Sequence, residues 1–116
     1  MENILRFKKE DLIGFAIRYM EKLGIPEKDA KIVVDVLISA DLRGVNSHGL
    51  IRINTYYNNR LEKKYMNPLT PVKIISETDS TISIGNGNGL GQVASYHAMQ
   101  KEMKYILDFI KDKTTQ

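Results

Sequence analysis

Apolar side chains recur at three- and four-residue spacing in the first half of the chain, a pattern typical of amphipathic helices. The first such segment runs from about Lys9 to Leu23 and ends at Gly24, a residue type that favours a helix end. The second begins at Pro26 and ends at Gly44. Because the connection is short, the pattern predicts an antiparallel helical hairpin. The predicted apolar faces are Leu12, Phe15, Ala16, Tyr19 and Leu23 in the first helix, and Ile32, Val33, Val36, Leu37 and Ala40 in the second.

A third helix is predicted from about Ser47 to Lys63, with its apolar stripe at Leu50, Ile53, Tyr57 and Leu61. Asn46 or Ser47 can cap this helix, because either side chain can accept a hydrogen bond from a free backbone N–H. Residues 67–71 contain two prolines and cannot continue a helix, so they predict an extended linker.

The second half of the chain begins with two short strand candidates, residues 72–77 and 81–85, which predict a β-hairpin. A glycine-rich turn at 85–91 then leads into a last helix, whose apolar positions are Tyr96, Met99, Met103, Ile106, Leu107 and Ile110. The predicted fold class is α+β and mainly helical: three amino-terminal helices, a small β-hairpin and a long helix. We expect two segments, residues 1–66 and 67–116.

Composition narrows the possible functions. The 116 residues are enough for one small domain, and the absence of cysteine excludes disulfides, thiolate metal sites and a cysteine nucleophile. The 17 basic and 14 acidic residues are interspersed, which argues against a nucleic-acid partner. No apolar run approaches the ~20 residues of a membrane span, and no signal peptide is evident. We therefore expect a cytoplasmic protein with no membrane partner and no metal site.

The glycine-rich turn follows a strand and opens a helix, which is the context of a dinucleotide fingerprint. The spacing is wrong, however, because the third glycine falls on Leu90 or Gln92 in the two possible registers. A phosphate-binding loop is excluded because no Lys-Ser or Lys-Thr follows. The pattern favours a turn with positive φ angles. The alternative is a helix amino terminus that lines an anion or substrate pocket.

His48 and Arg52 are four residues apart and share one face of the predicted third helix. A histidine can exchange a proton with a substrate oxygen near neutral pH, and an arginine can hold a carboxylate through two parallel hydrogen bonds. The pair therefore matches the needs of a 2-hydroxy or 2-oxo acid. By spacing alone such a pair is more often a surface or structural feature, and Ser47 is more often a helix cap than a proton relay. His97 is interpreted as structural.

Several segments read together resemble the type 2 malate/L-lactate dehydrogenase family. The most specific is Asp-Leu-Arg-Gly-Val-Asn-Ser-His-Gly at residues 41–49. The others are Ile51-Arg52, Tyr56-Tyr57, Asn67-Pro68, Glu77-Thr78 and the turn at 86–92. The resemblance covers roughly residues 8–100.

The resemblance implies an oxidoreductase in which a nicotinamide coenzyme, NAD or NADP, exchanges a hydride with a 2-hydroxy acid, a 2-oxo acid or a cyclic imine. It implies that His48 is the proton donor and acceptor, that Ser47 belongs to its relay, and that Arg52 grips the substrate carboxylate. It also implies a homodimer and a coenzyme fold unlike the Rossmann type, but it identifies no coenzyme-binding residue in this chain.

Members of that family are longer and continue into a segment that helps to bind the nicotinamide. We therefore expect this chain to be an amino-terminal fragment that is inactive alone. The alternative function is a non-catalytic helical module for interaction or oligomerisation, left from an interrupted dehydrogenase gene.

Overall fold

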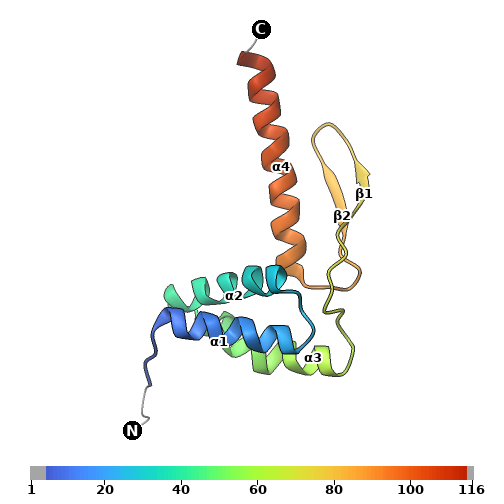
Figure 1. Ribbon diagram of the computed structural model, residues 1–116. Helices are drawn as coiled ribbons and strands as arrows, with labels where there is room; N and C mark the ends of the chain where they lie inside the picture. Colours follow the sequence, from blue (N-terminus) through green and yellow to red (C-terminus); the bar gives the residue numbers. More distant parts are fainter. Residues whose placement is uncertain (1–4, 115–116) are drawn as a thin grey trace.

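The computed structural model describes residues 5–114, so residues 1–4 and 115–116 of the two predicted segments lie outside it. The predicted fold class is confirmed: the described chain is mainly helical and holds one antiparallel β-hairpin (Figure 1). The elements in chain order are α1 (Lys9–Lys22), α2 (Glu27–Leu42), η1 (Asn46–His48), η2 (Ile53–Asn58), α3 (Asn59–Glu62), β1 (Lys73–Glu77), β2 (Ile82–Gly85) and α4 (Gly91–Thr114). In this part of the chain, no helix is both long enough and apolar enough to cross a membrane.

Helices α1 and α2 pack side by side and bury most of the core. Each is followed by a glycine with positive φ, Gly24 at 95° and Gly44 at 80°, as predicted for helix ends. Two predicted core positions are wrong: Phe15 is 61% exposed and Val36 is 46% exposed. Phe15 lies at the edge of its apolar stripe, and Met20 is fully buried instead. The buried face of α2 is rotated toward Ala30, Val34 and Ile38, which leaves Val36 outside it. The core residues are Ala16, Met20, Ile25, Ala30, Val33, Val34, Leu37, Ile38, Ile53, Tyr57, Leu61, Leu90 and Val93.

The third helical segment has the predicted apolar face but not the predicted form. Ile53, Tyr57 and Leu61 are buried as expected. The backbone, however, is a composite: η1 is a single 3₁₀ turn, η2 is a π-helix, and α3 is one short α-helical turn. The predicted cap by Asn46 or Ser47 is wrong, since the segment begins without a side-chain cap. The Ser47 hydroxyl bonds to the neighbouring His48 ring instead.

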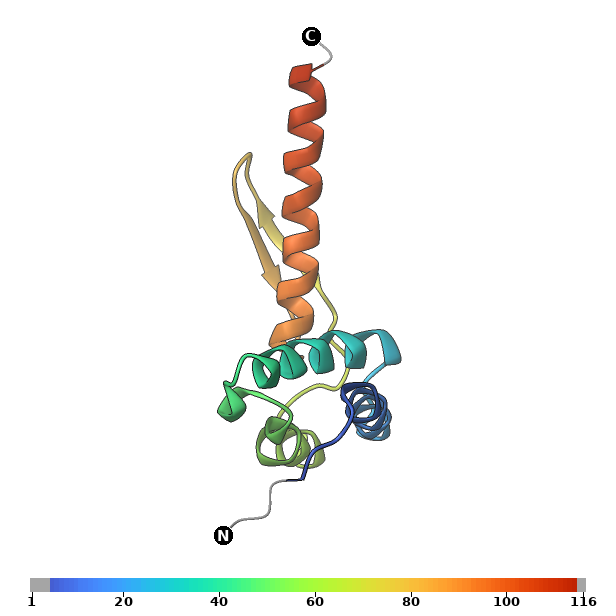
Figure 2. The same ribbon diagram turned by 90° about the vertical axis from the view of Figure 1, so that its left-hand side faces the viewer.

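The hairpin and α4 extend away from the helical layer. In Figures 1 and 2 the two strands run alongside α4, and the Tyr105 hydroxyl of α4 donates to the Glu77 carboxylate of β1. The principal dimensions are 65 × 32 × 21 Å and the radius of gyration is 17.5 Å. A compact chain of about 100 residues has a radius of gyration of about 13 Å. The described chain is therefore elongated, because the carboxyl half of α4 projects beyond the core.

Candidate functional site

The end of α2 and the turn into η1 are held together by Asp41. Its carboxylate accepts a hydrogen bond from the backbone N–H of Leu50 at 2.9 Å. A Cβ atom on Gly49 would lie 1.8 Å from the Asp41 Oδ1 atom, so any larger residue there would have to displace this carboxylate. The Val45 N–H also bonds back to the carbonyl of Ala40 at 2.9 Å. These contacts explain why Asp41 and Gly49 flank the Ser-His pair: together they close the loop that carries it.

Ser47 and His48 form a hydrogen-bonded pair on this loop. The Ser47 Oγ atom lies 2.9 Å from the His48 Nδ1 atom. The direction of this bond depends on the tautomer: a hydroxyl donor leaves the proton on Nε2, and an Nδ1–H donor leaves Nε2 as an acceptor. Within the described chain, Nε2 has no hydrogen-bond partner. The pair therefore leaves one ring nitrogen of His48 available to exchange a proton with a ligand.

Arg52 is docked on the same turn. Its Nε–H donates to the Ser47 carbonyl at 3.0 Å. This bond holds the guanidinium next to the Ser47–His48 turn. Its terminal nitrogens donate to no acceptor in the described part of the chain. The guanidinium carbon lies 5.6 Å from the centre of the Tyr56 ring. Arg52 therefore presents its two terminal nitrogens, the geometry that binds a carboxylate with two parallel bonds.

His48 and Arg52 line one cavity of about 720 Å³ between α2, the composite third segment and the start of α4. The lining side chains include two guanidiniums, one imidazole and several amides and phenols, and none is a carboxylate. The polar lining residues are His48, Arg52, Tyr56, Tyr57, Arg60, Tyr65, Asn86, Asn88 and Gln92. Such a lining favours an anionic ligand.

Tyr57 joins the third segment to α4 at the floor of this cavity. The Gln92 side-chain amide donates to its hydroxyl, and its ring meets Tyr56 edge-on at 5.0 Å between centroids. Burial raises the pKa of Tyr57, so the phenol stays neutral beyond its usual range. Tyr57 therefore contributes a neutral hydroxyl and a fixed wall rather than a charge.

The glycine-rich turn contributes backbone and amides to the cavity. Positive φ angles at Gly87 and Asn88, 59° and 61°, confirm the predicted turn conformation. A Cβ on Gly89 would lie 2.5 Å from the Thr70 Oγ1 atom, and one on Gly87 would lie 2.5 Å from Pro71. These glycines therefore allow close packing on the linker. Their positions give no reason to assign a phosphate site.

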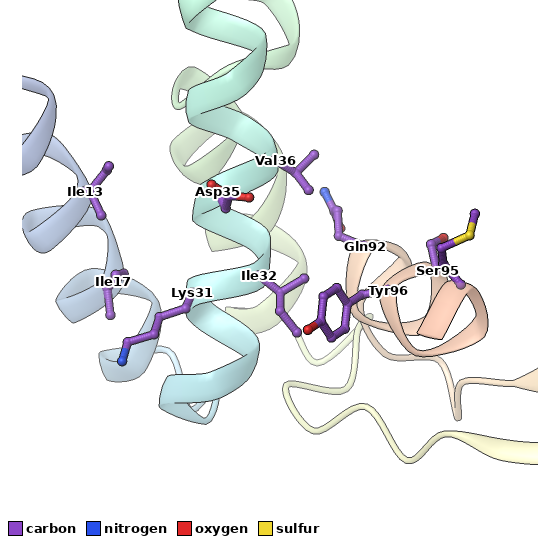
Figure 3. Close-up of a pocket in the computed structure, with 10 residues that line it drawn as sticks. Ile13, Ile17, Lys31, Ile32, Asp35, Val36, Gln92, Ser95 and Tyr96 are labelled. Atoms are coloured by element: carbon purple, nitrogen blue, oxygen red, sulfur yellow. The ribbon is translucent and has the colours of Figure 1, made fainter. Parts of the chain in front are cut away.

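A larger, apolar groove of about 940 Å³ lies between α1, α2 and α4 (Figure 3). Ile13 and Ile17 of α1, Ile32 of α2 and Tyr96 of α4 line it. Of the predicted site residues, none lies in this groove. The candidate site is therefore the smaller, polar cavity.

The structure brings together the three predicted site residues, Ser47, His48 and Arg52. It places His97 elsewhere, in α4, where its ring lies edge-on to Tyr96 at 5.6 Å between centroids. Sequence reasoning missed Arg60 as a cavity residue. The sequence could have indicated Arg60, because this residue continues the four-residue spacing of His48 and Arg52.

Comparison with known proteins assigns the chain to an oxidoreductase family. A family model described as malate/L-lactate dehydrogenase matches residues 7–107, and the chain belongs to this family. A malate dehydrogenase of Pyrococcus horikoshii is 41% identical over 107 residues, which are 92% of this chain and 29% of that protein. An L-sulfolactate dehydrogenase of Methanocaldococcus jannaschii is 39% identical over 84% of this chain and 28% of that protein.

Solved structures of malate dehydrogenases have the same fold over the matched part of the chain. The structure of the Pyrococcus horikoshii malate dehydrogenase superposes with a TM-score of 0.86, covering 93% of this chain and 31% of that one. A malate dehydrogenase from Entamoeba histolytica, 31% identical, gives the same TM-score over 92% of this chain and 30% of that one. The chain thus spans less than a third of the length of these relatives.

Proposed function

We propose that this chain is the amino-terminal segment of a nicotinamide-dependent dehydrogenase acting on a small 2-hydroxy or 2-oxo acid. One observation carries the proposal: His48, which is hydrogen-bonded to Ser47, and Arg52 line a cavity with no carboxylate in its lining. Family membership supports the reaction class. Relatives named malate dehydrogenase and L-sulfolactate dehydrogenase both carry the name of a 2-hydroxy acid.

In this proposal Arg52 binds the carboxylate next to the reacting carbon through its terminal nitrogens. The substrate hydroxyl then faces the His48 Nε2 atom, which takes its proton during oxidation. In the reverse direction the protonated ring gives a proton to the forming alkoxide. Ser47 accepts the hydrogen bond from Nδ1–H, which keeps Nε2 as the proton acceptor and holds the ring in place in both protonation states.

Family membership implies a coenzyme, NAD or NADP, which carries the hydride when bound. The described residues do not fit a dinucleotide site. The backbone N–H of Leu90 already bonds to Thr70 Oγ1 at 2.9 Å, and that of Gly89 bonds to the Asn86 carbonyl at 3.0 Å. We therefore assign no step through the coenzyme to this chain, and we expect its binding residues in the longer part of the complete enzyme.

The test is oxidation of NADH and NADPH with a panel of 2-oxo acids. The purified chain is assayed alone and together with the carboxyl-terminal part of the Pyrococcus horikoshii relative. We expect no turnover alone and measurable turnover from the mixture. His48→Asn should lower this turnover by at least about 100-fold, the usual contribution of a general acid or base. His97→Asn, a change of the second histidine, is the matched control and should leave the rate unchanged. Turnover independent of His48 would refute the assignment.

A second function is favoured by one specific observation. The apolar residues in the last turns of α4 are exposed: Ile106 by 56%, Leu107 by 54% and Ile110 by 50%. A helix with such a face suits a non-catalytic module that associates with another polypeptide. A mixture that forms a complex but never turns over would favour this function.

A further inference from the structure

Four polar and aromatic residues of the third segment follow one another at intervals of four: His48, Arg52, Tyr56 and Arg60. In a regular α-helix each such step overshoots the 3.6-residue turn, so the last residue would drift away from the first. The wider π-helical hydrogen bonds of Ile53–Asn58 correct this drift in the middle of the segment. All four side chains consequently line the same cavity.

The Tyr56 ring positions both arginines of this row. The guanidinium carbon of Arg60 lies 4.2 Å from the ring centre, and that of Arg52 lies 5.6 Å from it. Both are within the range of a cation–π contact. The two guanidiniums cannot be farther apart than the sum of these distances, a span that a four-carbon diacid can bridge. One aromatic ring therefore holds two cations near one another.

The Arg60 charge is not neutralised in the part of the chain that the structure describes. An ion pair is present there between Lys31 and Glu27, neither of which lines this cavity, and none involves Arg60. The Arg60 guanidinium has no hydrogen-bond acceptor among these residues either, so all five of its N–H donors remain available. Two adjacent cations without a counter-charge repel each other, and a ligand with two negative groups relieves this repulsion.

We propose that Arg60 is a specificity-determining residue that binds a second acidic group of the substrate. The inference rests on the proposed function, in which Arg52 binds the first carboxylate. The substrate class is then a 2-hydroxy or 2-oxo acid with a carboxylate or sulfonate at its other end. A substrate with a methyl group at that end, such as lactate, leaves Arg60 unused.

The experiment compares L-malate with L-lactate, which differ by this one acidic group. Binding to the full chain is followed through the ring resonances of His48. We expect malate to bind more tightly, and Arg60→Gln to lower the ratio of the two affinities by about tenfold, which corresponds to the loss of one hydrogen-bonded charge pair. Lactate affinity should stay the same. Arg60→Lys should keep part of the preference, because it keeps a point charge.

Two further variants separate this inference from the proposed function. Arg52→Gln should weaken both acids together, and Arg18→Gln, an exposed arginine of α1 outside the cavity, should weaken neither. An unchanged affinity ratio in Arg60→Gln would overturn the Arg60 inference, and a loss in Arg52→Gln would leave the proposed function standing. A wild-type chain that binds no malate would also overturn the inference, while the complemented turnover assay continues to test the proposed function by itself.

Discussion

Gly49 illustrates how a single residue controls the position of the candidate site. The Asp41 carboxylate occupies the space that a Cβ atom of residue 49 would need. The same carboxylate accepts a hydrogen bond from the backbone N–H of Leu50. An alanine at position 49 would push this carboxylate away and break the bond that closes the loop. Because Ser47 and His48 lie on this loop, its closure also determines where this candidate pair points.

We therefore expect Gly49→Ala to destabilise the chain by about 1–3 kcal/mol, the usual result of inserting a methyl group into an occupied space. Urea-induced unfolding measures this change. Gly14→Ala is the matched control: its Cβ would meet the flexible end of Arg18 at 3.3 Å, in the middle of α1. That helical position predicts a gain of about 0.5–1 kcal/mol. Equal stability of Gly49→Ala and the wild type would contradict the steric explanation.

The proximity of Ser47, His48 and Arg52 could be predicted from the sequence because they are close neighbours along one segment, and the family resemblance supplied their expected roles. Tyr57 and Gln92 could not be paired in this way, since their hydrogen bond joins positions 35 residues apart. It depends on where α4 lies against the third segment, which local spacing does not encode. The same holds for Asn86 and Asn88, which enter the cavity only because the glycine-rich turn packs on the linker.

Helix types are the feature that the sequence predicted least well. Composition and apolar spacing gave the correct buried face of the third segment, but they do not distinguish a π-turn from an α-turn. The two forms differ by one residue in the reach of their hydrogen bonds, and the same side chains suit both. The end of α1, both ends of α2 and the start of α4 were predictable, because glycine or proline lies at or near each of these boundaries.

The β-hairpin depends on α4 for its position, since a two-stranded sheet is marginally stable alone. The Tyr105 hydroxyl bonds to Glu77, and this bond raises the pKa of Tyr105. Because the folded-state pKa of Tyr105 is raised, the contact is fully present when the pH is below the ordinary tyrosine pKa. It is lost as the pH rises through the raised pKa.

We expect Tyr105→Phe to accelerate amide hydrogen exchange severalfold in Lys73–Glu77 and Ile82–Gly85, with a small effect on global unfolding. The same exchange should rise in the wild type when the pH is brought above the tyrosine range, after correction for the intrinsic rate. Tyr96→Phe, on the same helix, removes a hydroxyl for which the structure gives no hydrogen bond and serves as control. Unchanged exchange in the hairpin of Tyr105→Phe would show that other contacts position it.

The elongated shape of the chain leaves α4 with an uncovered apolar row. Tyr96, Met99, Met103, Ile106 and Ile110 alternate at three- and four-residue spacing, and each is between 47% and 60% exposed. This alternation is the seam of a two-helix coiled coil. In the part of the chain that the structure describes, nothing covers the carboxyl half of this row, so a second copy is a suitable partner for it.

We therefore expect the isolated chain to self-associate through α4 as its concentration rises. Light scattering should show a mass above 13.2 kDa for the wild type and a monomer for the double variant Ile106→Glu, Ile110→Glu. The two glutamates place like charges on the seam of both copies, which opposes pairing. Leu69→Glu changes another exposed leucine, 56% exposed in the linker, and should not alter the mass. A wild-type chain that stays monomeric at high concentration would refute pairing through α4. Masses that fall equally in both variants would place the contact elsewhere.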